Sequence, residues 1–382
     1  GNATHYAYDG FGQLWKQVSP DTGTTSFAYD ASGLQTSMTR NDGSALVYSY
    51  DGLGRLTWYG TSTDGRSFGY DWCGNGKGRL CDAGYSGGTR HFGYSPQGQI
   101  TATRDWTPSS DDWTGFQYDA FGRLNAVAYP SGMAVGYGYA YGKLTAMTVN
   151  VGGSISNVVM NTAYRPFGPS TGWTYGNGLT RNLYYDQNYT PADQRLTGIT
   201  TMNGSNTLQS LLMSYDANNQ ITGTNDYINS SLSSVYEYDG LGRLTRDSTP
   251  DGVVYRSFAY DANGNRTSTG KSGGPGYLIP PRTYQTDANS NRLMAVGGVN
   301  YSYDDKGNTI AAGADQYGYD AFNRLKTVVK DGVVTNYVIN AKDQRVSKTV
   351  GTTITRFTYV GQNQLLSENS GGANTNYLWF GS

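Results

Sequence analysis

The stretch Tyr50-Asp51-Gly52-Leu53-Gly54-Arg55-Leu56-Thr57 decides the fold, because the same eight residues return unchanged at Tyr238 to Thr245. Variants of this motif recur along most of the chain, and those from residue 8 to residue 139 follow one another at intervals of 20 to 24 residues. A unit of that length admits two strands and two turns. The sequence therefore predicts a tandem array of β-hairpins.

The motif is built on a tyrosine and the aspartate that follows it, joined in the fullest copies by a glycine and an arginine. The recurring residues are Tyr8, Asp9, Tyr29, Asp30, Tyr50, Asp51, Gly54, Arg55, Tyr70, Asp71, Tyr118, Asp119, Gly122, Arg123, Tyr215, Asp216, Tyr238, Asp239, Gly242, Arg243, Tyr260, Asp261, Tyr303, Asp304, Tyr319, Asp320 and Arg324. Looser copies begin at Tyr94, Tyr139 and Tyr359.

An aromatic residue stands two places before the motif tyrosine in most copies, as Tyr48 does before Tyr50. Residues two apart on a strand share a face, so each unit presents an aromatic pair on one side of a sheet. The aspartate can accept backbone N–H groups in an Asx turn, and the glycine three residues later tolerates a positive φ. Whether the tyrosine faces the arginine or the leucine across the hairpin depends on the loop, and the sequence leaves both registers open.

Composition agrees with turns and aromatic strands. The chain has 53 glycines and 34 tyrosines, and charged residues make up 15%, against roughly a quarter in ordinary proteins. A lone hairpin is marginal in water, so the units have to stack on one another, and the twist of a long sheet makes it curl. We expect an all-β fold in which tandem tyrosine-aspartate (YD) hairpins form one long curled or spiralling antiparallel sheet.

Charge and hydropathy exclude two classes of partner. The net charge is −1, so the chain lacks the basic footprint of a nucleic-acid-binding protein. No apolar run approaches the roughly 20 residues that cross a bilayer, and no signal peptide opens the chain. We expect no nucleic-acid partner and no membrane span.

The array is predicted to form a single segment over residues 1–382. Regular repeats occupy residues 1–144, an irregular insertion or long connection occupies 145–212, and further repeats follow over 213–382. Two stretches, Tyr184 to Arg195 and the glycine- and proline-rich Lys271 to Pro281, are expected to break the regular wall. The chain opens directly before a full motif and stops within an apparent strand, so we interpret it as part of a longer protein.

Two cysteines, Cys73 and Cys81, flank the glycine-rich stretch between residues 74 and 80. If this stretch is a hairpin loop, the two can face each other and form a disulfide, which implies an oxidising compartment. The alternative is a pair of free thiols in a β-rich layer. Two thiolates with no neighbouring ligand fall short of a closed zinc set, so no metal or cofactor is expected.

The recurring YD-x-x-G-R-L motif, its aromatic partner two residues before and the period near 21 resemble the YD-repeat proteins: bacterial Rhs proteins, the C subunits of insecticidal toxin complexes, wall-associated proteins and the animal teneurins. The resemblance covers nearly the whole chain. It implies a β-sheet that spirals into a hollow shell, which in bacterial members encloses a C-terminal toxic effector. The aspartate motif of the self-cleaving cap in those members is absent from this sequence, so neither the toxin nor the cap is carried over.

Catalytic interpretations find little support in the sequence. His5 and His91 have no nucleophile motif around them, and most aspartates occupy the motif turn. Three aspartates outside the motif, Asp226, Asp247 and Asp251, are where a catalytic carboxylate pair would have to lie. We expect no enzyme activity and no catalytic residue.

The main hypothesis is a structural shell segment of a secreted or surface bacterial Rhs-type protein that encloses or scaffolds a polypeptide cargo. Its partners are the remaining repeats and the C-terminal cargo of the parent protein, with edge-to-edge self-association through exposed strands. The alternative is a cell-surface adhesion or glycan-binding module on the same fold, with Trp106, Trp113 and Trp173 as stacking residues for a sugar or receptor.

Overall fold

The structure is a computed structural model that describes residues 2–186, 195–272, 281–361 and 364–380. Its elements in these ranges are 35 β-strands and one 3₁₀ turn, η1 (Ser230–Leu232). The strands belong to one sheet, and the paired strands run antiparallel to their neighbours in sequence. The expected all-β fold of tandem antiparallel hairpins is confirmed.

Contacts divide the chain into two units. Unit 1 comprises residues 1–133 and 286–378, and unit 2 comprises residues 134–285 and 379–382. The division of the sequence at residues 144 and 212 stays a prediction.

The strands of unit 1 fall in two runs, which we call the first layer (β1 to β12) and the second layer (β26 to β35). The first layer holds β1 (His5–Tyr8), β2 (Leu14–Ser19), β3 (Gly23–Tyr29), β4 (Gln35–Thr39), β5 (Ala45–Tyr50), β6 (Leu56–Gly60), β7 (Gly65–Tyr70), β8 (Leu80–Tyr85), β9 (Gly88–Tyr94), β10 (Ile100–Thr107), β11 (Ser110–Tyr118) and β12 (Leu124–Ala128). The second layer holds β26 (Leu293–Val296), β27 (Val299–Tyr303), β28 (Thr309–Ala312), β29 (Asp315–Tyr319), β30 (Leu325–Lys330), β31 (Val333–Ile339), β32 (Arg345–Val350), β33 (Thr353–Val360), β34 (Gln364–Ser370) and β35 (Ala373–Asn376).

Unit 2 is built from the strands between these two runs. They are β13 (Ala134–Ala140), β14 (Lys143–Val151), β15 (Ser154–Tyr164), β16 (Ser170–Tyr175), β17 (Thr180–Tyr185), β18 (Leu196–Asn203), β19 (Asn206–Tyr215), β20 (Ile221–Asp226), β21 (Ser234–Tyr238), β22 (Leu244–Ser248), β23 (Tyr255–Tyr260), β24 (Arg266–Ser272) and most of β25 (Arg282–Thr286).

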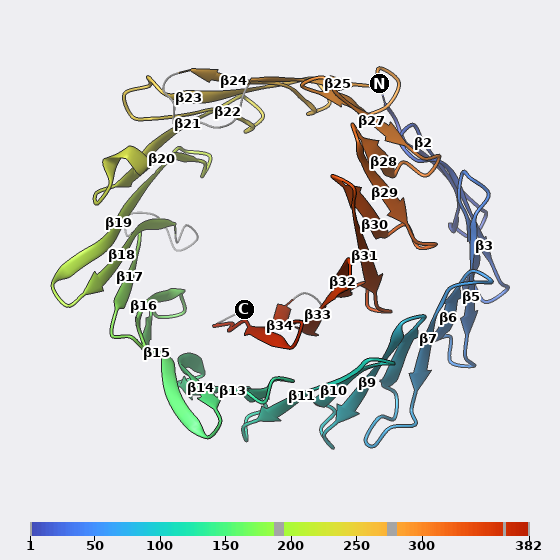
Figure 1. The fold of residues 1–382 in the computed structure, drawn as a ribbon, viewed down its shortest axis with the longest axis horizontal. Coiled ribbons are helices and arrows are strands. Elements are labelled where there is room, and N and C mark those ends of the chain that lie inside the picture. Colours follow the sequence, from blue (N-terminus) through green and yellow to red (C-terminus); the bar gives the residue numbers. More distant parts are fainter. Residues whose placement is uncertain (1, 187–194, 273–280, 362–363, 381–382) are drawn as a thin grey trace. The chain divides into compact units, whose positions relative to one another are not determined.

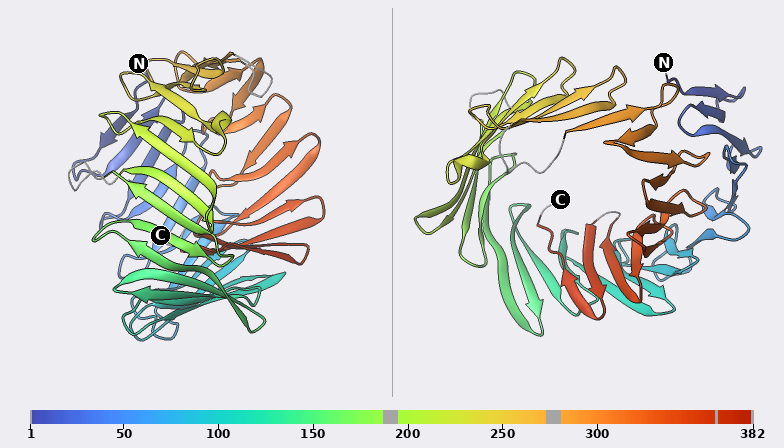
Figure 2. Two further views of the ribbon diagram at one scale, coloured as in Figure 1. Left: turned by 90° about the vertical axis from the view of Figure 1, so that its left-hand side faces the viewer. Right: turned by 45° about the horizontal axis from the view of Figure 1, so that its top comes forward.

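The two layers of unit 1 lie side by side although some 200 residues separate them in sequence. Figure 1 shows the orange and red strands β27 to β33 running along the blue and teal strands of the first layer, and the right-hand view of Figure 2 shows the same arrangement. Side-chain contacts agree, since Phe322 lies edge-on to Tyr59 with ring centroids 5.2 Å apart. The second layer thus packs on the aromatic side of the first around Tyr59.

Each motif forms the loop of one hairpin. In the copy at Asp51, the amide of Asp51 donates to the carbonyl of Arg55 at 3.0 Å, and the amide of Gly54 donates to the carbonyl of Asp51 at 2.9 Å. Gly54 has a φ of 76°, as a type I turn followed by a left-handed residue requires. Asn219 and Asn323 hold the same place in variant copies with φ of 67° and 64°, because asparagine tolerates this conformation better than most residues.

The motif aspartate organises this loop from within. Oδ1 of Asp51 accepts the backbone N–H groups of Leu53 and Arg55, both at 2.9 Å, and Oδ2 accepts Nε of Arg55 at 2.7 Å. The backbone bond from Arg55 is the largest cause that lowers the pKa of Asp51. The two backbone bonds recur in the loops that begin at Asp9, Asp30, Asp119, Asp216, Asp239, Asp261, Asp304 and Asp320.

The structure settles the register that the sequence left open. Across the hairpin, Tyr50 lies opposite Leu56, with a bulge beside it. The motif arginine turns instead toward the next hairpin, where the guanidinium of Arg55 lies 4.5 Å from the ring centroid of Tyr70. Of the two registers left open, the one with leucine opposite tyrosine therefore occurs, and the arginine contacts a tyrosine ring of the next hairpin instead of its own.

The motif tyrosine also joins its hairpin to the preceding one by a hydrogen bond. Strands β4 and β5 pair only near the turn that connects them, over residues 37–39 and 45–47. At the other end the phenol O–H of Tyr50 donates to the carbonyl of Gln35 at 2.9 Å. Burial raises the pKa of Tyr50, so the phenol stays a donor.

At least thirteen bonds of this kind occur among the described residues, with O–O distances between 2.5 and 3.0 Å. The donor and acceptor residues are Tyr29 and Leu14, Tyr50 and Gln35, Tyr70 and Leu56, Tyr94 and Leu80, Tyr118 and Ile100, Tyr164 and Leu144, Tyr185 and Ser170, Tyr215 and Leu196, Tyr238 and Ile221, Tyr260 and Leu244, Tyr303 and Leu293, Tyr319 and Thr309, and Tyr359 and Arg345.

The stretch 145–212, where the sequence period blurs, keeps the hairpin pattern. Strands β14 to β19 pair in order, and Tyr164 and Tyr185 make the same bond to the preceding hairpin. Most of the two stretches expected to interrupt the wall, residues 187–194 and 273–280, lie outside the described residues.

Tyr50→Phe should weaken the junction between β4 and β5, because it removes the phenol donor and leaves the carbonyl of Gln35 without it. The expected loss is about 0.5 to 1.5 kcal/mol, the ordinary net value of one such bond. Hydrogen exchange of the β4 and β5 amides should accelerate by up to about tenfold. Tyr8→Phe is the matched control, since Tyr8 is exposed and its phenol makes no such bond among the described residues. Equal effects of the two variants would contradict the role given to the bond.

Candidate functional site: the seam between the layers of unit 1

The seam is the surface along which the second layer of unit 1 packs on the first. Aromatic and aliphatic side chains of the first layer, including Phe92, Phe116 and Tyr118, line a cavity of about 340 Å³ there, and Tyr359 and Val360 close it from the second layer. This apolar packing brings the layers together. The specific contacts within the seam are polar.

Arg90 of β9 is the central ion of the seam and is 3% exposed. Its Nε and Nη2 donate to both carboxylate oxygens of Asp105 on the neighbouring strand, at 2.7 and 2.6 Å. Its Nη1 donates to Oε1 of Gln344 at 2.9 Å, and Nη2 also reaches the carbonyl of Tyr359 at 3.2 Å. One buried guanidinium thus joins a fixed carboxylate in the first layer to two groups of the second.

Burial in this region also affects a neighbouring phenol. Tyr85 of β8 has its pKa raised to about 12, first by burial and then by the negative charge of Asp105. The tyrosine therefore stays neutral beside the ion pair of Arg90 and Asp105.

Arg66 of β7 is a second buried cation and is 2% exposed. It donates to Oδ1 of Asp64 and to the carbonyl of Gly65, both at 2.9 Å, within its own layer. Its guanidinium lies 4.2 Å from the ring centroid of Phe322 and 4.0 Å from the carboxylate of Asp320. A motif loop of the second layer is thereby held between an arginine and Tyr59 of the first.

The turns of the first layer meet further motif loops of the second. Arg292 donates from Nε and Nη2 to the carbonyl of Asp21 at 2.9 and 2.6 Å, and Lys306 pairs with Asp42 at 3.0 Å. Gly307 lies so close to this turn that a Cβ at its position would be 2.6 Å from the carbonyl oxygen of Asp21. Only glycine fits this approach without a shift of the backbone.

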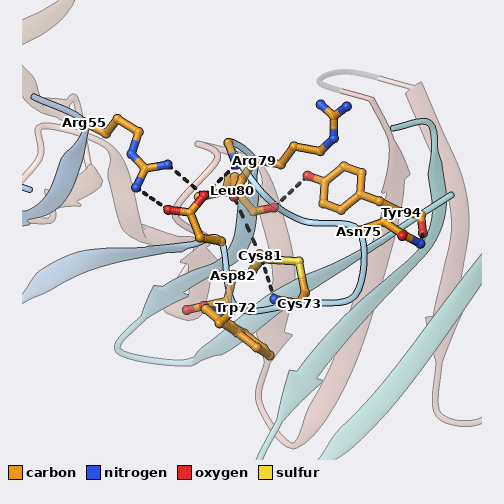
Figure 3. The surroundings of a disulfide bond; sticks show 11 residues. Arg55, Trp72, Cys73, Asn75, Arg79, Leu80, Cys81, Asp82 and Tyr94 are labelled. Atoms are coloured by element: carbon orange, nitrogen blue, oxygen red, sulfur yellow. Dashed lines mark hydrogen bonds and ion pairs between the residues drawn. A yellow bond between two sulfur atoms is a disulfide. The ribbon is translucent and has the colours of Figure 1, made fainter. Parts of the chain in front are cut away.

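One motif loop departs from the pattern and carries the disulfide. Cys73 and Cys81 are bonded through their Sγ atoms across a loop lengthened to residues 71–79 (Figure 3). Asp71 does not accept the usual pair of backbone bonds. It accepts Gly78 N–H at 2.6 Å and two bonds from Arg55 of the preceding loop at 3.1 and 2.6 Å.

The lengthened loop also contacts the hairpin that follows it. Nδ2 of Asn75 donates to the carbonyl of Tyr94 at 3.0 Å, and the Tyr94 phenol donates to Leu80 at 2.6 Å. Figure 3 shows Tyr94 and Leu80 joined in this way beside the disulfide. The loop therefore links three successive hairpins, and a cross-link of this kind typically adds about 2 to 4 kcal/mol to stability.

The sequence candidates for chemistry occupy structural places. Oδ1 of Asp226 accepts the amides of Ile228 and Asn229, buried Asp247 pairs with Arg256, and Asp251 accepts the hydroxyl of Thr249. Each of these aspartates therefore serves a turn or an ion pair in unit 2.

The two histidines also take structural places. His5 is exposed on β1, and His91 lies edge-on to the ring of Trp72.

Two of the three candidate tryptophans lie together, and a third residue joins them. Trp106 and Trp113 lie on the paired strands β10 and β11, where Arg104 faces Trp113 and Asp111 faces Trp106. Trp72 is the third member of this group, and its Nε1 donates to the carboxylate of Asp82 on β8 at 2.8 Å. Trp173 lies elsewhere, in unit 2, against Tyr175 and Phe380.

In the described ranges no group of three His, Cys, Asp or Glu side chains is placed to hold a metal ion. Across the same residues, no helix has the length and apolar character needed to span a membrane. Sequence reasoning missed Arg66, Arg90, Asp105 and Gln344, which carry the seam. The two second-layer partners of Arg90, Gln344 and Tyr359, stand 254 and 269 residues away from it in sequence. No local sequence pattern marks such a pairing.

Arg90→Ala should open the seam locally, because it leaves the Asp105 carboxylate buried without its partner and removes both bonds to the second layer. Breaking a buried ion pair costs about 3 to 5 kcal/mol. Hydrogen exchange of β31 to β34 should accelerate by at least about a hundredfold while β2 to β5 stay protected. The control is Arg104→Ala on β10, whose pair with Asp111 is exposed and is worth about 0 to 1 kcal/mol. Similar exchange in both variants would show that Arg90 does not hold the layers.

Two family models match parts of the chain, and two curated relatives match a third of it. The teneurin YD-shell model matches residues 184–368, and the RHS repeat model matches residues 8–45 and 29–63. Two curated relatives, the tRNA3(Ser)-specific nuclease WapA of Bacillus spizizenii and the tRNA nuclease WapA of Bacillus subtilis, are each 32% identical over 130 residues. That match covers 32% of this chain and 5% of each relative.

Solved structures extend the likeness to nearly the whole chain. The crystal structure of TcdB2-TccC3-Cdc42 matches with a TM-score of 0.82 at 17% identity, over 97% of this chain and 22% of that one. The Photorhabdus luminescens Tc holotoxin pore, with a substituted TccC3, matches with a TM-score of 0.79 at 16% identity, over 96% and 22%. The chain thus spans about a fifth of these structures, and at this identity the likeness concerns the fold. In its repeated motif and hairpin geometry the chain thus resembles YD-repeat proteins, with residues 8–63 matching RHS repeats and residues 184–368 matching the teneurin YD-shell.

Proposed function

We propose that this chain is a wall segment of a shell that encloses a polypeptide carried by the same parent protein. The matches to the YD-shell and RHS repeat models support a shell-like structural role, and the enclosure of cargo is the part proposed. The observation that supports it best is the seam, in which two arginines, each no more than 3% exposed, hold distant parts of the chain together as a double layer. A wall that must retain a polypeptide needs layers that do not separate.

A structural role also accounts for where the charged side chains are used. The motif aspartates organise the hairpin loops, and the buried arginines join the two layers. Both kinds of charged side chain therefore have structural roles in the wall. We therefore propose that this segment has no catalytic activity of its own. The tRNA nuclease activity in the names of the WapA relatives belongs to proteins of which this chain matches 5%.

An extracytoplasmic location is part of the same proposal. The disulfide between Cys73 and Cys81 supports it, because such bonds form and persist in oxidising compartments and are rare in the cytosol. The other partners proposed are the remaining repeats of the parent protein.

Limited proteolysis of the chain together with the polypeptide that follows it in the parent protein tests the enclosure. The following polypeptide should resist cleavage in the wild type and become sensitive in the double variant Arg66→Ala, Arg90→Ala, since an opened seam admits the protease. Arg104→Ala should leave the protection intact. Cleavage of that polypeptide at the same rate in the wild type as in isolation would refute the enclosure and leave the shell fold untouched.

Glycan binding is a second candidate function, favoured by one surface of unit 1. Trp72, Trp106 and Trp113 are 62%, 42% and 54% exposed, and large exposed aromatic groups of this kind mark binding sites. His91 and Arg104 lie between them, since cross-strand partners in register share a face. This face is opposite to the seam, because Arg90 and Asp105 are the neighbours of His91 and Arg104 in sequence.

Charge at this aromatic surface favours a neutral ligand. Asp111 holds Arg104 through both carboxylate oxygens, at 2.6 and 2.9 Å, and Trp113 lies 5.3 Å from the same guanidinium. The neutralised arginine offers no net attraction to a polyanion. The guanidinium lies over one face of the Trp113 indole, and the exposed rings of Trp72 and Trp106 beside it can pack on the C–H face of a sugar.

Titration with neutral oligosaccharides, followed by tryptophan fluorescence, tests the second candidate. Trp72→Ala and Trp113→Ala should each weaken binding by about tenfold or more, as the loss of an aromatic anchor does. The control Trp15→Ala removes a tryptophan of β2 that is 46% exposed and lies outside this surface. No saturable change in the wild type would remove glycan binding from consideration.

A further inference from the structure

The two edges of each layer of unit 1 differ in kind. Because the hairpins follow one another in an antiparallel meander, the motif loops line one edge, which we call the motif rim. The turns between successive hairpins line the other edge, which we call the return rim. In the seam, motif loops of the second layer contact return turns of the first, as Arg292 does at Asp21 and Lys306 does at Asp42. The layers are therefore stacked head to tail.

Phe322 shows how the tip of a motif loop docks. It stands two residues after the motif aspartate Asp320, and its ring lies between the guanidinium of Arg66 and the edge of Tyr59. In the same loop, the carbonyl of Ala321 accepts Nη1 of Arg40 at 2.9 Å. The apolar tip of a motif loop therefore has a defined binding position on another layer of the same fold.

The corresponding tips of the first layer are uncovered. Phe11, Leu53 and Phe121 occupy the place of Phe322 in their own loops and are 93%, 79% and 83% exposed. Side chains of this kind are ordinarily buried, and burying each one is worth about 1.5 to 3 kcal/mol. The motif rim of the first layer is thus an apolar surface with an established mode of docking and no layer on it among the described residues.

The return rim of the second layer is uncovered as well. Val299, Val333 and Val334 lie at or next to its turns and are 45% to 51% exposed. Unit 1 thus carries an apolar motif rim on one layer and an apolar return rim on the other, on the sides that the seam does not use. A head-to-tail interface whose ends remain free can repeat.

We propose that the motif rim of one copy of this chain docks on the return rim of a second copy, which takes the place of the next layer. The phenyl and leucine tips of the first layer pack against the valine side chains at the turns of the partner. This continues the head-to-tail order of the seam. The inference rests on the proposed shell role only in treating the two layers as layers of a shell wall. The docking surfaces themselves lie outside the seam.

Complementation between two variants tests the docking. The motif-rim variant carries Phe11→Ser, Leu53→Ser and Phe121→Ser, and the return-rim variant carries Val299→Lys, Val333→Lys and Val334→Lys. In sedimentation velocity the wild type should form chains of copies whose length grows with concentration. Each variant alone should associate at least about tenfold more weakly, and an equal mixture of the two should form dimers, because each contributes one intact rim.

A matched triple variant separates docking from general stickiness. Trp15→Ser, Val47→Ser and Trp113→Ser remove exposed apolar side chains from strand faces of the first layer and should leave the association unchanged. Three outcomes overturn the proposal: a wild type that stays monomeric at every concentration, a motif-rim variant that associates like the wild type, or a mixture that forms no dimer. Because these changes leave the seam intact, protease protection of the following polypeptide still reports on the shell role separately.

Discussion

The hydrogen bond from a motif tyrosine to the preceding hairpin is the contact on which the rest of the structure depends. A two-stranded hairpin is marginal by itself, so the fold persists only if successive hairpins are joined along their length. The ladder joins them near the return turns, and the phenol joins them at the motif end, as Tyr50 does at Gln35. Each bond contributes about a kcal/mol. Among the described residues at least thirteen such bonds together fix the alignment of successive hairpins.

The seam uses a different kind of interaction. Arg66 and Arg90 are buried with carboxylates of their own layer, and such pairs contribute little net stability compared with apolar packing. Their value is positional, because a guanidinium held by Asp64 or Asp105 has its remaining donors and its flat face fixed in direction. Only one placement of the second layer then satisfies Gln344 and Phe322. The apolar cavity walls supply attraction, and the buried ions set the alignment.

Departures from the repeat are the informative positions. The loop at Asp71 gives up the usual turn to hold the disulfide and to receive Arg55 from the loop before it. The loop at Asp320 keeps the turn but places Phe322 in a seat instead of in solvent, whereas Phe121 at the same motif place is exposed. The same loop geometry therefore places Phe322 in a contact between layers and leaves Phe121 exposed at the surface.

The sequence by itself determined the hairpin, its loop and its period, because these depend on residues within about one repeat of each other: Asp51 and Gly54 form their turn wherever the motif occurs. It also indicated the family and brought Cys73 and Cys81 to attention. Only the tertiary structure decided that Tyr50 faces Leu56, that Arg55 turns to the next hairpin, and that Arg90 meets Gln344. The register depends on a bulge that the motif does not spell out. The seam joins residues 254 positions apart: Arg90 lies outside the motif, and Gln344 takes the place of the arginine in a variant motif loop that begins at Asn340, so their pairing arises only when the layers meet.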